Sequence, residues 1–396
     1  SAGLRAMVST LKAVKRVNIS LKTYEELQKR VEVGKKLIEE AIGKAPEVAL
    51  GHYLLGKAWK LLGWEDKAEA CWREAIRLDP KFGLAHFQLG MLFLERAIAT
   101  KASGYQAEFR EEREKHAAAT LSDARKELDL AAGSTWVGDD EVSTELLRVA
   151  TAFVAGEEER VLELAVAAVE RFGNGEGCER FHVLASFALK GDEHVAALNR
   201  ALGVCPRDAF AAFLRGNARA AEGDYDGAIT DYDQATAINP RYWKALYNRG
   251  LARQAQGDID GAIADYDQAI AINSRVTEAF INRGAARTAK GDLDGAIADF
   301  DQAIAINPRC AEAFYNRATP RWAKGDLDGV IADLDRAVAI NPRFADAFNN
   351  RGLAREARGD VEGAIEDYAK ALEVAPANWP HRKDVEEALR DVREKR

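Results

Sequence analysis

Polar and apolar positions along the second half of the chain repeat every 34 residues. The phrase GDIDGAIADYDQAIAINS, which begins at Gly257, returns with few changes at Gly223, Gly291, Gly325 and Gly359. A Gly-Asp pair opens each complete copy of this pattern and predicts a turn, because Gly ends one helix and Asp or its equivalent caps the next. The pattern therefore predicts two helices in every repeat.

Small residues and one aromatic residue recur at fixed places in the predicted helix pairs. A glycine in the first helix and an alanine in the second are small enough to let two helices approach closely. An aromatic residue fills the space between units, and a proline closes the second helix. These positions are Gly216, Gly250, Gly284 and Gly352; Ala228, Ala262, Ala296 and Ala364; Tyr232, Tyr266, Phe300 and Tyr368; and Pro240, Pro308, Pro342 and Pro376.

With these positions, residues 209–378 resemble five tandem tetratricopeptide repeats. The resemblance implies an all-α, right-handed superhelical solenoid of antiparallel helix pairs. The tail at 379–396 is then expected to form a polar capping helix, because its apolar residues fall on one face. The five units are 209–242, 243–276, 277–310, 311–344 and 345–378, and the apolar residues of the tail are Val385, Leu389 and Val392.

The repeat pattern is weaker in the first half of the chain. One unit keeps the repeat spacing, and the next opens with Gly83 but lacks its turn, which predicts a long helical hairpin with its tip near Ser103–Gly104. Two degenerate units follow, and two separate helices precede the whole region. The segments are 1–48 with helices at 3–17 and 24–42, then a divergent repeat region over 49–208 with its matching unit at 49–82, the hairpin near 95–132, and degenerate units at about 139–173 and 177–208.

Composition and charge exclude several classes of function. The net charge of −8 and the pI of about 5.5 do not favour nucleic-acid binding, which needs a basic face. No apolar run in the sequence has the length of a membrane span, and the charged, amphipathic stretch at 4–14 does not resemble a signal peptide. The cysteines are too far apart in the sequence for a metal site, which favours reduced thiols in a cytoplasmic protein. They are Cys71, Cys178, Cys205 and Cys310.

No residue pattern indicates catalysis, a metal or a cofactor. The six histidines are scattered and lack the spacing of zinc ligands. The sequence motifs of hydrolases, kinases and P-loop proteins are absent. Paired aspartates such as Asp265 and Asp267 recur in nearly every unit, which is typical of a surface or inter-helix feature rather than of one active site. The sequence predicts a protein that is not an enzyme and holds no cofactor.

The resemblance implies that the first helix of each unit lines a concave groove that binds an extended peptide. An asparagine recurs at the sixth position of successive units, and its amide can both donate to and accept from a peptide backbone. The alternative is that these amides bond neighbouring helices. Acidic residues accumulate toward the C-terminal end of the groove, which favours a partner with basic character. The predicted groove residues are Asn248, Asn282, Asn316 and Asn350, with Tyr247, Tyr315, Trp322 and Lys244 beside them.

Arginines form a second recurrent set, and each unit also carries an aspartate on its second helix. Phosphate binding is one interpretation of these arginines, and Arg–Asp pairing between helices is the other. We expect the pairs to be exposed and to contribute about 0.2–1 kcal/mol each. The arginines are Arg215, Arg249, Arg283, Arg317 and Arg351, with Arg219, Arg253, Arg287, Arg321 and Arg355 four residues later; the aspartates are Asp231, Asp265, Asp299, Asp333 and Asp367.

The unit at 311–344 departs from the pattern at four positions together. Ala318 replaces the glycine, Val330 the alanine and Leu334 the aromatic residue, and Pro320 lies inside the first helix. An interior proline costs about 3 kcal/mol and removes one hydrogen bond. We expect a kink over 316–320 that shifts one asparagine of the groove; neutral drift is the alternative.

Together these features predict a non-catalytic scaffold that binds a protein or peptide in the groove of its repeats. Two alternatives remain open. The chain could be the regulatory or substrate-recruiting segment of a larger bacterial signalling enzyme, such as a Ser/Thr kinase, because repeats of this style resemble those attached to such enzymes. It could also be a self-assembly module that uses the hairpin or a terminal helix.

Overall fold

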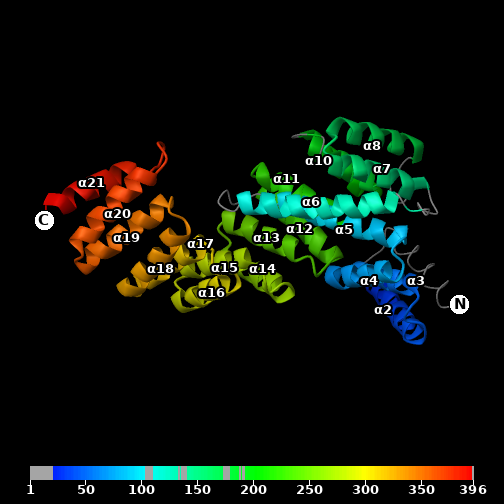
Figure 1. The fold of residues 1–396 in the computed structure, drawn as a ribbon, viewed down its shortest axis with the longest axis horizontal. Coiled ribbons are helices and arrows are strands. Elements are labelled where there is room, and N and C mark those ends of the chain that lie inside the picture. Colours follow the sequence, from blue (N-terminus) through cyan, green and yellow to red (C-terminus); the bar gives the residue numbers. More distant parts are fainter. Residues whose placement is uncertain are drawn as a thin grey trace. The chain divides into compact units, whose positions relative to one another are not determined.

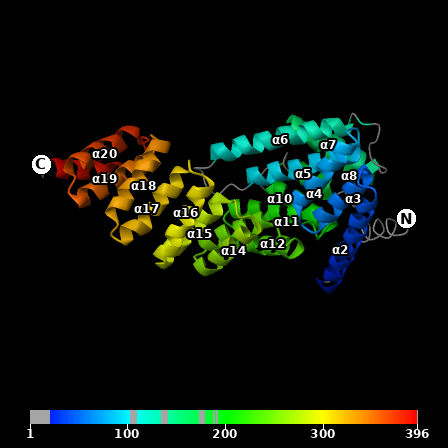
Figure 2. The same ribbon diagram turned by 60° about the horizontal axis from the view of Figure 1, so that its bottom comes forward.

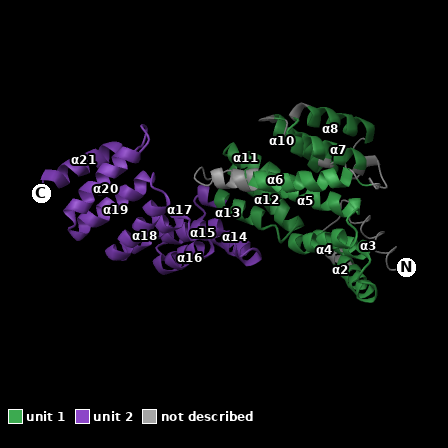
Figure 3. Ribbon diagram, in the orientation of Figure 1, with its two compact units in different colours: residues 1–252 green, residues 253–396 purple. Residues whose placement is uncertain are grey.

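A computed structural model describes residues 21–102, 110–132, 134, 141–172, 179–186, 189 and 192–394. Within these ranges the regular elements are α-helices, so the predicted all-α fold of consecutive helix pairs is confirmed (Figure 1). The chain divides into two compact units, unit 1 over Ser1–Ala252 and unit 2 over Arg253–Arg396 (Figure 3). The predicted helix at 3–17 and the predicted hairpin tip lie outside the described residues.

Unit 1 contains the divergent part of the array. Helices α5 and α6 lie side by side in both views and form the longest helix pair of the unit (Figures 1 and 2). The last helix, α13, begins in unit 1 and ends three residues beyond its boundary. The helices are α2 (Leu21–Lys44), α3 (Ala49–Leu61), α4 (Glu65–Leu78), α5 (Gly83–Ala102), α6 (Arg110–Ala132), α7 (Glu141–Ala155), α8 (Glu158–Phe172), α9 (Glu179–Ser186), α10 (Asp192–Val204), α11 (Ala209–Ala221), α12 (Tyr225–Ile238) and α13 (Trp243–Ala255).

Unit 2 contains regular helix pairs followed by one terminal helix. The apolar face of that terminal helix is buried, whereas its remaining side chains are mostly exposed. The helices are α14 (Ile259–Ile272), α15 (Thr277–Lys290), α16 (Leu293–Ile306), α17 (Ala311–Ala323), α18 (Leu327–Ile340), α19 (Ala345–Arg358), α20 (Val361–Val374) and α21 (Arg382–Glu394).

The turns within the helix pairs form as the Gly-Asp pairs predict. Gly257 has a φ of 85°, a left-handed conformation that favours glycine, and its equivalents share it. The carboxylate of the following Asp258 accepts a hydrogen bond from the backbone N–H of Gly261 at 2.9 Å, which caps helix α14. The same cap recurs at Asp224, Asp292, Asp326 and Asp360.

Glycine and aromatic side chains meet inside each regular pair. A Cβ atom on Gly284 of α15 would lie 2.9 Å from Cζ of Phe300 on α16, and Phe300 is buried. Gly352 and Tyr368 repeat this arrangement between α19 and α20. The aromatic ring therefore fills the space beneath the glycine of its own unit, which explains why only a residue without a side chain fits there.

The Arg–Asp pairs are buried, so the expectation of weak exposed pairs is wrong. Asp299 on α16 is 3% exposed and accepts from two arginines of α15, at 2.5 Å from Arg283 Nη2 and 2.9 Å from Arg287 Nη1. Arg283 also reaches Asp267 of the preceding pair. The pattern recurs at Asp333 and Asp367. The first arginine of each unit holds successive helix pairs together, because Arg283, Arg317 and Arg351 each bond carboxylates of two different pairs.

The irregular unit keeps its helices. Helix α17 runs from Ala311 to Ala323 with Pro320 inside it, and the kink expected over 316–320 stays a prediction. Val330 and Leu334 of α18 are both buried and replace the alanine and aromatic ring of the regular units.

Candidate functional site

The predicted asparagine series divides into buried and accessible members. In unit 1, Asn248 is 1% exposed, and its Nδ2 donates to Oδ1 of Asn217 on α11 at 2.7 Å. The same Asn217 oxygen accepts from the hydroxyl of Tyr232 at 2.8 Å. Asn248 therefore bonds neighbouring helices, as the alternative interpretation expected.

In unit 2 the series comes closer to the surface toward the C-terminal end. Asn282 is 4% exposed, whereas Asn316 and Asn350 are half-buried. Nδ2 of Asn350 on α19 donates to the hydroxyl of Tyr315 on α17 at 3.1 Å. Among these three amides, Asn316 and Asn350 are the ones that another molecule can reach.

The predicted aromatic residues differ in the same way. Tyr247 of unit 1 is buried. In unit 2, Tyr315 is half-buried, with its ring 4.8 Å from that of Phe344. Trp322, near the end of α17, is 44% exposed. Large exposed aromatic side chains are typical anchors of protein interfaces.

Lys244 lies in a cluster of charged residues inside unit 1. Its Nζ is 3.5 Å from the backbone carbonyl of Arg96 on α5. Nearby, Nζ of Lys60 pairs with Glu65 at 3.0 Å and with Glu95 at 2.8 Å. Burial lowers the pKa of Lys244 to about 8; Glu65 opposes this shift, and Arg96 and Lys60 add to it. The first repeat of unit 1 thus covers the position that the sequence assigns to the groove.

Two turns that are distant in the sequence meet beside this cluster. The guanidinium of Arg241 stacks 3.4 Å above the ring of Trp64. A Cβ atom on Gly63 would lie 2.3 Å from Oδ1 of Asn239, so the two turns pack against each other directly. The turn between α3 and α4 therefore packs against the turn between α12 and α13.

We predict that Lys244→Met stabilises unit 1 by about 1–2 kcal/mol at pH 7, because the buried ammonium is unfavourable there. The folded pKa of about 8 lies below the ordinary 10.5, so the unfolded chain binds more protons between these values. The wild type consequently gains stability as pH rises from 8 to 10.5, and the difference between the two proteins shrinks. Chemical unfolding at pH 7 and pH 10 measures this, and Lys290→Met, at an exposed ion pair, is the control. An equal difference at both pH values contradicts the prediction.

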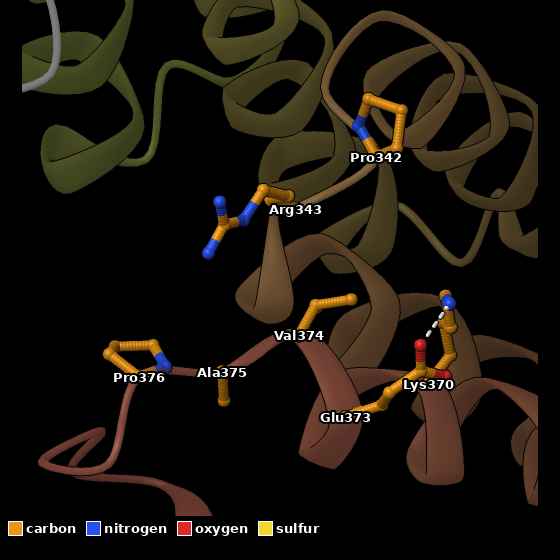
Figure 4. A pocket seen from close by; sticks show the side chains of 7 residues that line it. All are labelled: Pro342, Arg343, Lys370, Glu373, Val374, Ala375 and Pro376. Atoms are coloured by element: carbon orange, nitrogen blue, oxygen red, sulfur yellow. Dashed lines mark hydrogen bonds and ion pairs between the residues drawn. The ribbon is translucent and has the colours of Figure 1, made fainter.

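A shallow cavity of about 580 Å³ lies elsewhere in unit 2, at the turn before α19 and the end of α20 (Figure 4). Lys370 and Glu373 form an ion pair of 2.7 Å on its wall. None of the predicted groove residues lines this cavity. Its lining residues are Pro342, Arg343, Lys370, Glu373, Val374, Ala375 and Pro376.

The described residues offer no arrangement for metal chemistry. Within them, no group of His, Cys, Asp or Glu side chains could hold a metal ion. His86 is engaged in the fold, with Nδ1 at 2.6 Å from Glu127 and Nε2 at 3.1 Å from the carbonyl of Pro80. In the part of the chain that the structure describes, no helix combines the length and apolar character needed to cross a membrane.

Comparison with known families identifies the repeat. Models described as "Tetratricopeptide repeat" match residues 49–82, 243–275 and 345–378, and a model described as "TPR repeat" matches 216–257 and 284–319. A search of curated protein sequences finds no match.

Solved structures with similar repeats resemble parts or most of the chain. The crystal structure of MamA is 28% identical, with a TM-score of 0.39, and the match covers 40% of this chain and 93% of that one. A tetratricopeptide repeat protein from Parabacteroides merdae ATCC 43184 is 19% identical, with a TM-score of 0.46 and coverage of 64% and 98%. The APC/C hetero-tetramer Cut9–Hcn1 is 17% identical, with a TM-score of 0.48 and coverage of 93% and 85%.

Proposed function

The chain is a tetratricopeptide-repeat protein, and we propose that it is a non-catalytic scaffold that binds a protein or an extended peptide on its first helices. The observation that carries the proposal is the exposure of Trp322 on α17, the helix that also carries the accessible amide of Asn316. The buried Asn282 belongs to the packing of unit 2, whereas Asn248, Tyr247 and Lys244 belong to the packing of unit 1.

The proposed partner has basic character. Acidic side chains occupy groove positions of unit 2, and they favour a segment that carries Lys or Arg. The proposal includes a cytoplasmic location, which the reduced state of Cys71, Cys205 and Cys310 supports. The acidic residues are Glu278, Glu312, Asp346 and Glu356.

Site-specific crosslinking tests the proposed surface. A photo-crosslinking amino acid is placed at Thr319, an exposed residue of α17, and in a second protein at Ala332, an exposed residue of α18 on the second helix of the same unit. We expect a partner to be crosslinked from position 319 and not from position 332. Crosslinks from 332 alone, or from neither position, contradict the proposal.

Affinity for the captured partner then tests the amides. Asn316→Ala with Asn350→Ala removes two hydrogen-bonding groups, each of which contributes about 0.5–1.5 kcal/mol. We expect the double variant to weaken binding about 5- to 100-fold in calorimetric titration. Asn378→Ala, at an exposed amide in the turn before α21, is the control and should bind as the wild type does. Unchanged affinity in the double variant excludes these amides as contacts.

A further inference from the structure

We propose that Trp322 and Leu353 form the apolar anchor of this surface and take an apolar side chain of a partner segment that is flanked by Lys or Arg. The inference rests on the proposed function and adds to it the position and chemistry of the contact. Within residues 253–394, the exposed large hydrophobic side chains are these two, at 44% and 42%. A pair of exposed apolar groups on adjacent first helices loses water contact when a partner covers it.

Helices α17 and α19 run in the same direction. Helix α18 is antiparallel to α17, because Arg317 bonds Asp333 whereas the later Arg321 bonds the earlier carbonyl of Gly329. It is also antiparallel to α19, because Arg351 bonds Asp335 while Arg358 bonds Asp328. Two antiparallel steps leave α17 and α19 parallel.

The two apolar residues follow a bonded pair of residues in the same direction along these parallel helices. The bond from Asn350 to Tyr315 fixes which faces of α19 and α17 meet. Leu353 follows Asn350 by one helical turn, and Trp322 follows Tyr315 by two turns. Because the two helices are parallel, both residues therefore lie on the C-terminal side of the bond between Asn350 and Tyr315.

In the irregular unit the position of Trp322 makes no hydrogen bond to a buried tyrosine, because that unit has no such tyrosine. In two regular units the residue equivalent to Trp322 accepts from the buried tyrosine: Tyr266 donates to Gln254 and Tyr368 to Glu356, each at 3.0 Å. In the irregular unit the buried residue is Leu334, which has no hydroxyl to donate. A hydrogen-bond acceptor at position 322 would therefore have no tyrosine hydroxyl to accept from. The position instead carries the exposed indole of Trp322.

The unit at 277–310 supports this coupling. Its aromatic residue is Phe300, which also lacks a hydroxyl, and the equivalent of Trp322 is Thr288. The Thr288 hydroxyl donates to the backbone carbonyl of Gly284 at 2.9 Å, within its own helix. When the buried residue of the unit lacks a hydroxyl, as Phe300 and Leu334 do, the equivalent of Trp322 need not be a hydrogen-bond acceptor. In the irregular unit this position carries a large aromatic side chain. Neutral drift does not account for an exposed tryptophan on α17 together with an exposed leucine on α19 as simply as binding does.

The charges around the anchor select a basic segment. Glu312, Asp346 and Glu356 occupy the neighbouring groove positions of α17 and α19. Two arginines of each of these helices are held by a buried aspartate: Arg317 and Arg321 by Asp333, and Arg351 and Arg355 by Asp367. Paired arginines contribute little positive potential, so the carboxylates dominate the field at the anchor.

Peptide selection tests the anchor independently of any natural partner. A random dodecapeptide phage library is selected on the full chain, and the enriched peptides are synthesised and titrated by calorimetry. We expect enriched peptides with an apolar residue flanked by Lys or Arg. We expect Trp322→Ala and Leu353→Ala each to weaken their binding at least tenfold, and Trp322→Phe to retain most of it.

The controls distinguish loss of binding from misfolding, and failure of the anchor from failure of the proposed scaffold function. The two side chains are 44% and 42% exposed and lie outside the core, so the variants should keep the circular dichroism of the wild type. Glu312→Gln should weaken binding mainly at low salt. Enrichment of acidic peptides, no enrichment, or equal binding by Trp322→Ala overturns the anchor. If a partner still crosslinks from position 319 in that case, the scaffold function stands without the anchor; if none does, both fail.

Discussion

Asp299→Ala is expected to lower the free energy of unfolding of its repeat by about 3–5 kcal/mol, because it leaves two arginines without their buried counter-charge. The carboxylate is 3% exposed and bonds Arg283 and Arg287 of the preceding helix. The matched control is Asp301→Ala, on the same helix. Asp301 is 50% exposed and pairs with Arg317, so its loss should cost about 1 kcal/mol or less.

The measurement must resolve single repeats, because an array of repeats does not unfold in one step. Native-state hydrogen exchange reports the stability of α16, which carries Asp299, and of α15, which carries the two arginines. Protection there should fall in Asp299→Ala far more than in Asp301→Ala. Equally small losses of protection in the two variants would contradict the prediction, because the buried pair would then contribute no more than an exposed one.

The helix pairs could be predicted because their determinants are local. The turn needs only Gly257 with its left-handed backbone and Asp258 to cap the next helix, and these residues are adjacent in the sequence. The close contact of Gly284 with Phe300 lies within one repeat and returns in the others. These residues are easy to recognise in the sequence, because the same residue types recur at the same spacing in several repeats.

The burial of the charges could not be predicted, because it depends on neighbours in three dimensions. The sequence shows that Arg283 and Asp299 recur together, but the depth of the carboxylate follows from the stacking of whole helix pairs. The contact of Trp64 with Arg241 has no sequence signal at all, since it joins a divergent repeat to a regular one. Neither residue belongs to a pattern that the two segments share.

The sequence predicts which helix face carries the candidate site residues, but it does not predict how deeply each side chain is buried. The period places Asn248 and Asn316 at equivalent positions, yet the first is buried and the second is accessible. Leu353 was missed because a single leucine in an amphipathic helix is usually a core residue. The equivalent residues are Leu251, Ala285 and Thr319, so the residue type at this position gives no clear signal.

Pro320→Ala is expected to stabilise α17 by about 1–3 kcal/mol. The alanine N–H can bond the carbonyl of Asn316, whereas proline cannot, and the loss of the buried ring offsets part of the gain. The reciprocal variant, Ala286→Pro, places proline at the equivalent position of α15 and should destabilise that helix by about 3 kcal/mol. Hydrogen exchange of α17 and α15 measures both changes.

The same pair of variants decides whether the irregular unit serves binding. If Pro320 positions Trp322, which lies two residues further on, Pro320→Ala should gain stability and lose affinity for the selected peptides. Such opposite changes are expected where a binding site is maintained at the expense of stability. Drift instead predicts a more stable protein with unchanged affinity. If Pro320→Ala gains no stability and Ala286→Pro loses none, the array tolerates interior prolines, and the irregularity at 311–344 then has no energetic cost that function must explain.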